Sequence, residues 1–149
     1  MAPRTDDLQK QMVIHELGHY LVAAHYGISA EILTDGNYYF VEIPNIFPKT
    51  QDGLEQALTI AMGGYAANLL CGYENRLQYL GDIRTSFEHL RSYHELKNGS
   101  FQYADAKPGN IPLMVYEPFI QNAKDILISY GGKDYLEVAA EHLLKQLKE

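Results

Sequence analysis

The pattern of apolar residues predicts a buried helix near the N-terminus. Residues three and four apart form one mostly apolar row: Leu8, Met12, His15, His19, Val22 and Tyr26. A second row contains Val13, Leu17, Leu21 and Ala24. A helix that is apolar on two sides is typical of a protein core. We therefore predict a buried helix over residues 5–26, ended by Gly27.

A different pattern follows over residues 30–43. Aliphatic and aromatic residues flank the turn sequence Thr-Asp-Gly-Asn at positions 34–37. β-Branched and aromatic residues on either side of such a turn predict a β-hairpin.

The remaining segments have helical spacing. We predict helices over residues 53–71, opened by a capping box that starts at Asp52, over 81–97, over 119–129 and over 134–148. The last two are expected to form an antiparallel pair packed on the first helix. Gly63 and Gly64 interrupt the apolar row of the second helix, and we expect them to allow close packing against the first. The predicted fold is a mainly α (α+β) single domain, residues 1–149, with a small β-hairpin.

Composition excludes several classes of protein. Of the 149 residues, 46% are hydrophobic and 21% are charged, as in an ordinary globular domain. The net charge of −7 argues against a nucleic-acid partner. Cys71 is the single cysteine and is expected to be a buried apolar residue. Because we find neither a signal-peptide profile nor an apolar run long enough to span a membrane, we expect a cytoplasmic protein.

Two histidines four residues apart lie inside the first predicted helix. Residues 15–19 read His-Glu-Leu-Gly-His, an HExxH pattern that presents the imidazoles of His15 and His19 to one point, with Glu16 beside them. A catalytic Zn²⁺ takes three protein ligands and keeps a fourth position for water, from which a neighbouring carboxylate can remove a proton. This pattern predicts a zinc metallopeptidase with Glu16 as the catalytic base.

The third ligand is less clear from the residues alone. Asp82 is a candidate because a carboxylate completes many sites that contain two histidines. An aspartate near a helix start is also favoured by capping and by the helix dipole. Spacing leaves several rivals open: Glu74, Glu88, His89, His94 and Asp105.

Beyond these residues, the chain resembles the peptidase domain of the FtsH family, the membrane-anchored AAA+ zinc proteases. Residues 15–22 are similar to the family's HEAGHALV block, and residues 60–70 to its LGGRAAEEL helix. Residues 81–83, Gly-Asp-Ile, fall where that family has its third zinc ligand, an aspartate that opens the next helix. The resemblance implies that His15, His19 and Asp82 bind zinc and that Glu16 is the base.

The departures from that family change the expected partners. Tyr65 stands where the family has arginine and Asn68 where it has glutamate, so a polar contact in that helix is expected to be missing. Only 14 residues precede the metal motif, and they contain no Gly-rich phosphate loop. We therefore expect any unfolding ATPase to be a separate protein or absent. The expected substrate is an unfolded or flexible polypeptide, and the hairpin either binds its backbone at a sheet edge or only covers the first helix.

Two other functions stay open. One is a protease that cleaves a repressor of a mobile element, since such enzymes share the His-Glu-x-Gly-His helix. The other is a zinc-stabilised interaction or regulatory module, for which the 12 tyrosines would provide contact area. A purely structural zinc site would close its fourth position and would not need Glu16, so this residue favours the peptidase.

Overall fold

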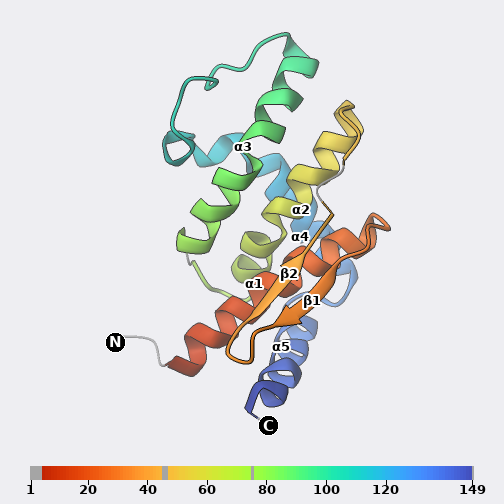
Figure 1. The fold of residues 1–149 in the computed structure, drawn as a ribbon, viewed down its shortest axis with the longest axis vertical. Helices are drawn as coiled ribbons and strands as arrows, with labels where there is room; N and C mark the ends of the chain where they lie inside the picture. The colour runs from red at the N-terminus through yellow and green to blue at the C-terminus, as the bar shows by residue number, and fades with distance from the viewer. Residues whose placement is uncertain (1–4, 45–46, 75, 149) are drawn as a thin grey trace.

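The computed structural model describes residues 5–44, 47–74 and 76–148. Over these residues the chain is mainly helical, with one small antiparallel hairpin, as predicted (Figure 1). The helices are α1 (Thr5–His25), α2 (Gln51–Leu70), α3 (Arg76–Asn98), α4 (Glu117–Ser129) and α5 (Gly132–Lys148), and two 3₁₀ turns, Pro108–Asn110 and Leu113–Val115, precede α4. The strands β1 (Glu31–Thr34) and β2 (Tyr39–Glu42) pair with Ile32 opposite Val41.

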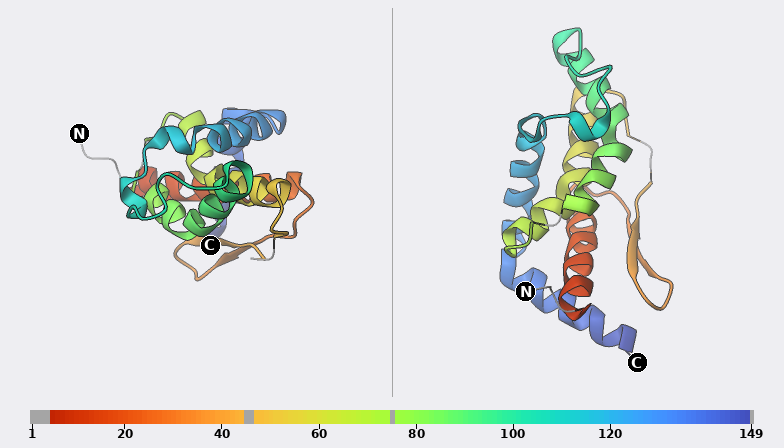
Figure 2. Two further views of the ribbon diagram at one scale, coloured as in Figure 1. Left: turned by 90° about the horizontal axis from the view of Figure 1, so that it is seen from above. Right: turned by 90° about the vertical axis from the view of Figure 1, so that its left-hand side faces the viewer.

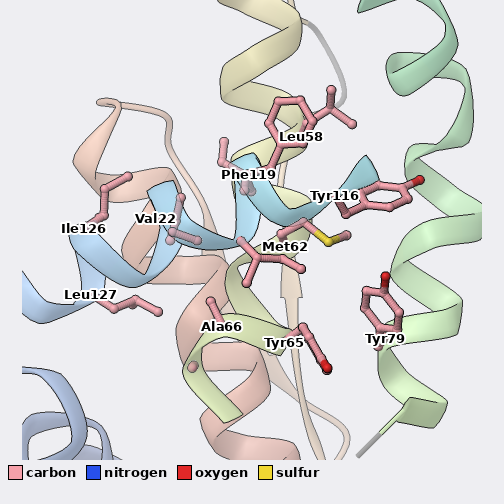
Figure 3. Packing of buried hydrophobic residues seen from close by; sticks show 14 of the residues in the cluster. Val22, Leu58, Met62, Tyr65, Ala66, Tyr79, Tyr116, Phe119, Ile126 and Leu127 are labelled. Atoms are coloured by element: carbon pink, nitrogen blue, oxygen red, sulfur yellow. The ribbon is translucent and has the colours of Figure 1, made fainter. Parts of the chain in front are cut away.

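Helix α2 lies at the centre of the fold because almost every residue from Gly53 to Asn68 is buried. It packs against α1, α3 and α4, whereas α5 packs mainly on α1. The hairpin lies on one side of α1, and α4 lies on the other (Figure 2). Figure 3 shows the core around α2, in which Met62 and Tyr65 of α2 lie among side chains of α1, α3 and α4.

Glycines bring α1 and α2 into backbone contact. A Cβ atom added to Gly18 would overlap the carbonyl group of Gly63, and one added to Gly63 would lie 2.7 Å from the carbonyl oxygen of Gly18. A Cβ atom added to Gly64 would lie 2.5 Å from Nε2 of His15. The prediction that Gly63 and Gly64 serve close packing is therefore confirmed.

The predicted limits of α1 and of the hairpin are confirmed to within a residue or so, and Gly27 follows α1 with a positive φ of 72°. The predicted start of α2 is wrong. Thr50, not Asp52, is the N-cap, with extended backbone and a side-chain oxygen that accepts a hydrogen bond from the Gly53 N–H. Asp52 instead lies in the first turn, where a carboxylate interacts favourably with the helix dipole.

The start of α3 is also wrong, since the helix begins at Arg76 and not at Gly81. Tyr79 is buried against Tyr65, with ring centroids 4.4 Å apart, and this tertiary packing stabilises the additional turn (Figure 3). Helices α4 and α5 both contact α1, as predicted. They do not form the expected closely packed antiparallel pair, because α4 packs chiefly on α2 and α5 on α1.

Cys71 is buried, and burial raises the pKa of its thiol to about 11, which agrees with its interpretation as a small apolar residue. Within the described ranges, no helix combines the length and apolar character needed to cross a membrane.

Candidate metal centre

Helix α1 places the two histidine side chains side by side, as their spacing predicts. Both are buried, with 3% of His15 and 9% of His19 exposed. Their rings meet edge to face, with centroids 4.7 Å apart, and their Nε2 atoms are 3.1 Å apart. Two imidazole nitrogens therefore converge on one position.

Asp82 of α3 completes this cluster. Its Oδ2 atom lies 2.8 Å from Nε2 of His15 and 3.2 Å from Nε2 of His19. Because α3 begins at Arg76, Asp82 lies in the second turn and does not cap the helix. Its backbone carbonyl accepts hydrogen bonds from Thr85 and Ser86, while its carboxylate faces the histidines.

The rivals of Asp82 do not join the histidine pair. The side chains of Glu74 and Asp105 are exposed, and Glu88 pairs with Arg91 at 2.6 Å. His94 stacks on Phe101, and His89 contacts Phe47. Among the described residues, only His15, His19 and Asp82 form a group that could hold a metal ion.

The donor set fits a zinc ion. A tetrahedral zinc with bonds of about 2.0–2.2 Å holds its ligand atoms about 3.3–3.6 Å apart. The three distances observed, 2.8 to 3.2 Å, are slightly shorter, so small side-chain movements would admit the ion. In addition, Oδ2 of Asp82 is buried and forms no hydrogen bond of good geometry, although both Nε2 atoms lie close to it. A zinc ion between the three atoms would bind this carboxylate oxygen directly.

A backbone carbonyl orients His19. The Nδ1 atom of this ring lies 2.7 Å from the carbonyl oxygen of Ile60 in α2. Because a carbonyl can only accept, Nδ1 carries a proton, and in the neutral ring Nε2 presents its lone pair to the cluster. The role of Ile60 could not be predicted from the sequence, because every residue type has a backbone carbonyl.

Asn68 of α2 approaches His15 in a comparable way. Its Nδ2 atom is 3.4 Å from Nδ1 of His15, and its side chain is fully buried. Asn68 therefore makes a polar contact of its own, with His15. An asparagine among the apolar residues of a buried helix was the available signal.

The charges of the cluster are coupled. Burial of His19 disfavours its protonated form, but the Asp82 carboxylate and Glu16 outweigh this effect and raise its pKa to about 9. Burial of Asp82 disfavours its carboxylate, yet His19 and His15 outweigh it and lower its pKa to about 2. Without a metal, Asp82 and His19 form a buried ion pair near neutral pH.

Glu16 lies beside the cluster without joining it. Its Oε2 atom accepts a hydrogen bond of 3.0 Å from the backbone N–H of Val41 in β2. Burial raises the pKa of this carboxyl group, and His19 and His15 oppose the shift. The hydrogen bond holds one carboxylate oxygen and leaves the other able to accept a proton.

A cleft of about 420 Å³ opens over Glu16, His19 and Asp82. Apolar residues of the hairpin, of the segment after it and of α2 form much of its wall: Val41, Ile43, Phe47, Ala57, Ile60 and Ala61. His89 and Thr85 of α3 also line the cleft. A molecule in this cleft would therefore contact both the carboxylate of Glu16 and the three clustered side chains.

Comparison of the chain with known protein families, with curated proteins and with solved structures finds no match.

Proposed function

We propose that the protein is a zinc-dependent metallopeptidase that hydrolyses peptide bonds of unfolded or flexible polypeptides. The observation that carries this proposal is the convergence of His15, His19 and Asp82 within 3.2 Å of one another, with Glu16 beside them at an open cleft. A structural zinc site has four protein ligands, whereas this cluster offers three. The resemblance of the HExxH segment to the FtsH peptidase domain supports the same activity.

Each residue then has a distinct role. His15, His19 and Asp82 would hold the zinc ion, which supplies a Lewis acid for the peptide carbonyl and lowers the pKa of a water. Glu16 is the general base that accepts the proton of the attacking water and returns it to the leaving amine. Its raised pKa makes it a stronger base than an exposed carboxylate.

The hairpin supports an extended substrate. The Val41 N–H bonds to Glu16, so this edge of β2 faces α1 and the cleft and does not face β1. A polypeptide in extended conformation can lie along such an edge by adding backbone hydrogen bonds. Folded proteins do not present extended segments without unfolding, which favours disordered substrates. We propose that a separate ATPase unfolds folded substrates before they are degraded. We also propose a cytoplasmic location, because a buried single cysteine is in keeping with a reducing compartment.

The test compares Glu16→Gln with His15→Ala and with the wild type. Glu16→Gln should retain zinc, measured by elemental analysis, and lose about 100-fold or more of its casein hydrolysis in the absence of nucleotide. His15→Ala should lose zinc as well. Glu42→Gln, which changes an exposed carboxylate on β2, is the matched control and should resemble the wild type.

Two outcomes would contradict the proposal. Equal zinc loss in Glu16→Gln and His15→Ala would make Glu16 a ligand and not the base. A zinc-loaded wild type that cleaves neither casein nor short peptides would favour a zinc-stabilised interaction module. A stably folded domain offered alongside casein should remain intact, and a chelator should abolish all cleavage.

A further inference from the structure

We propose that Asn68 is a positioning residue whose side-chain oxygen accepts a hydrogen bond from Nδ1–H of His15 and thereby fixes the imidazole with Nε2 toward the metal position. This inference rests on the proposed zinc site, and it concerns the proton on Nδ1 of His15, which can be observed without measuring peptidase activity.

The first observation is an unpaired acceptor. Asn68 is fully buried on α2, and its Oδ1 atom has no hydrogen-bond partner among the described residues. Its Nδ2 atom faces Nδ1 of His15 at 3.4 Å, a long distance for a hydrogen bond. An unsatisfied buried oxygen next to a ring nitrogen indicates that the amide has a more favourable orientation.

The second step follows from counting protons. A neutral imidazole has one N–H, and Nε2 of His15 must be free of a proton to bind a metal. Nδ1 then carries the proton and needs an acceptor, which an amide nitrogen cannot provide. Rotation of the amide by half a turn exchanges two groups of nearly equal size and places Oδ1 against Nδ1. That orientation gives both groups a partner.

The third observation is the arrangement of α2 against the two histidines. Ile60, Gly64 and Asn68 are four residues apart and therefore lie in one row on this helix. The Ile60 carbonyl accepts from Nδ1 of His19, and Gly64 leaves room for the His15 ring. Because α1 and α2 touch at Gly18 and Gly63, the short asparagine side chain reaches His15. One row of α2 thus orients both imidazoles by the same chemistry.

The experiment compares three variants by two measurements. Asn68→Leu removes the acceptor at similar volume, whereas Asn68→Asp keeps an acceptor in either orientation. Thr59→Val is the matched control, because Thr59 is a buried polar residue of the same helix whose hydroxyl bonds to the Glu55 carbonyl. Circular dichroism establishes that each variant is folded.

The first measurement is the His15 Nδ1–H signal in zinc-loaded protein, by ¹⁵N-resolved NMR at neutral pH. Wild type, Asn68→Asp and Thr59→Val should show a hydrogen-bonded, slowly exchanging Nδ1–H, and Asn68→Leu should lose this signal. The second is zinc affinity by competition with a chromophoric chelator. Asn68→Leu should bind about 10- to 100-fold more weakly, with affinity restored in Asn68→Asp.

An unchanged Nδ1–H signal and unchanged zinc affinity in folded Asn68→Leu would overturn the inference. Equal weakening in Asn68→Leu and Asn68→Asp would also overturn it, since only the volume or shape of asparagine would then matter. If zinc-loaded wild-type protein shows the bonded Nδ1–H signal, and Asn68→Leu does not, while the wild type cleaves no polypeptide, the positioning contact stands and the proposed peptidase function fails.

Discussion

The backbone N–H of Val41 donates a hydrogen bond of 3.0 Å to the carboxylate of Glu16. These residues are 25 positions apart, one in the second strand of the hairpin and the other in the metal helix. Because the same N–H points away from β1, the bond orients the proposed base without interrupting the sheet. The hairpin is therefore part of the candidate site as well as a cover for α1.

Val41→Pro should lower the turnover number because proline has no N–H to hold Glu16. We expect a fall of about 10- to 100-fold with zinc content unchanged, since the ligands are not altered. Steady-state hydrolysis of an unstructured peptide measures the effect. Val41→Ala keeps the N–H and serves as control, and equal turnover in both variants would show that the hydrogen bond has no role in catalysis.

Zinc binding should release about one proton near pH 7.5, because His19 is protonated in the metal-free protein and must be neutral to bind. Its pKa of about 9 means that zinc affinity should rise with pH until about pH 9 and level off above it. Titration calorimetry in buffers with different ionisation enthalpies counts the protons. A pH-independent affinity between pH 6 and 9 would contradict the His19 assignment.

The ion pair of His19 and Asp82 should stabilise the metal-free protein most between about pH 4 and 6.5. The raised pKa of His19, about 9 against 6.5, gives stability that is complete below pH 6.5 and lost as pH rises through 9. The lowered pKa of Asp82, about 2 against 3.8, gives stability that is complete above pH 3.8 and lost as pH falls through 2. Urea denaturation from about pH 2 to about pH 10 should show the loss of stability on the acidic and on the alkaline side, and Asp82→Asn should reduce both losses.

Gly64→Ala should weaken zinc binding by at least about tenfold and destabilise the fold by about 1–3 kcal/mol, because the new methyl group would overlap the His15 ring. Gly81→Ala provides the contrast. Gly81 lies within α3 with open space around its Cα, so alanine should raise the free energy of unfolding by about 0.5–1 kcal/mol. Urea denaturation and chelator competition measure both effects. Similar behaviour of the two variants would contradict the close packing of α2 on His15.

The part of the site that lies within one helix could be predicted from the sequence. The spacing of His15 and His19 determines their geometry within one helix, so their convergence could be predicted. Asp82 is distant in sequence, and the residues alone did not distinguish it from Glu74 or His89. Only the packing of α3 on α2 brings its carboxylate to the histidines.

The contacts that orient the site were mostly invisible. The Ile60 carbonyl and the Val41 N–H are backbone groups, whose positions depend on tertiary structure and not on residue type. The early start of α3 was missed because the burial of Tyr79 against Tyr65 acts across two helices. Asn68 differs, since a polar residue in an apolar helical row can be recognised directly from the sequence.

The contact between Gly18 and Gly63 has a consequence for how the molecule opens. Where two helices touch backbone to backbone, no side chain can change rotamer to let them separate gradually. Exposing the amides of α1 between the two histidines to solvent then requires the helices to part as units. Hydrogen exchange at these amides should therefore occur only through global unfolding, at the slowest rate in the protein. The candidate metal centre would melt together with the fold and not before it.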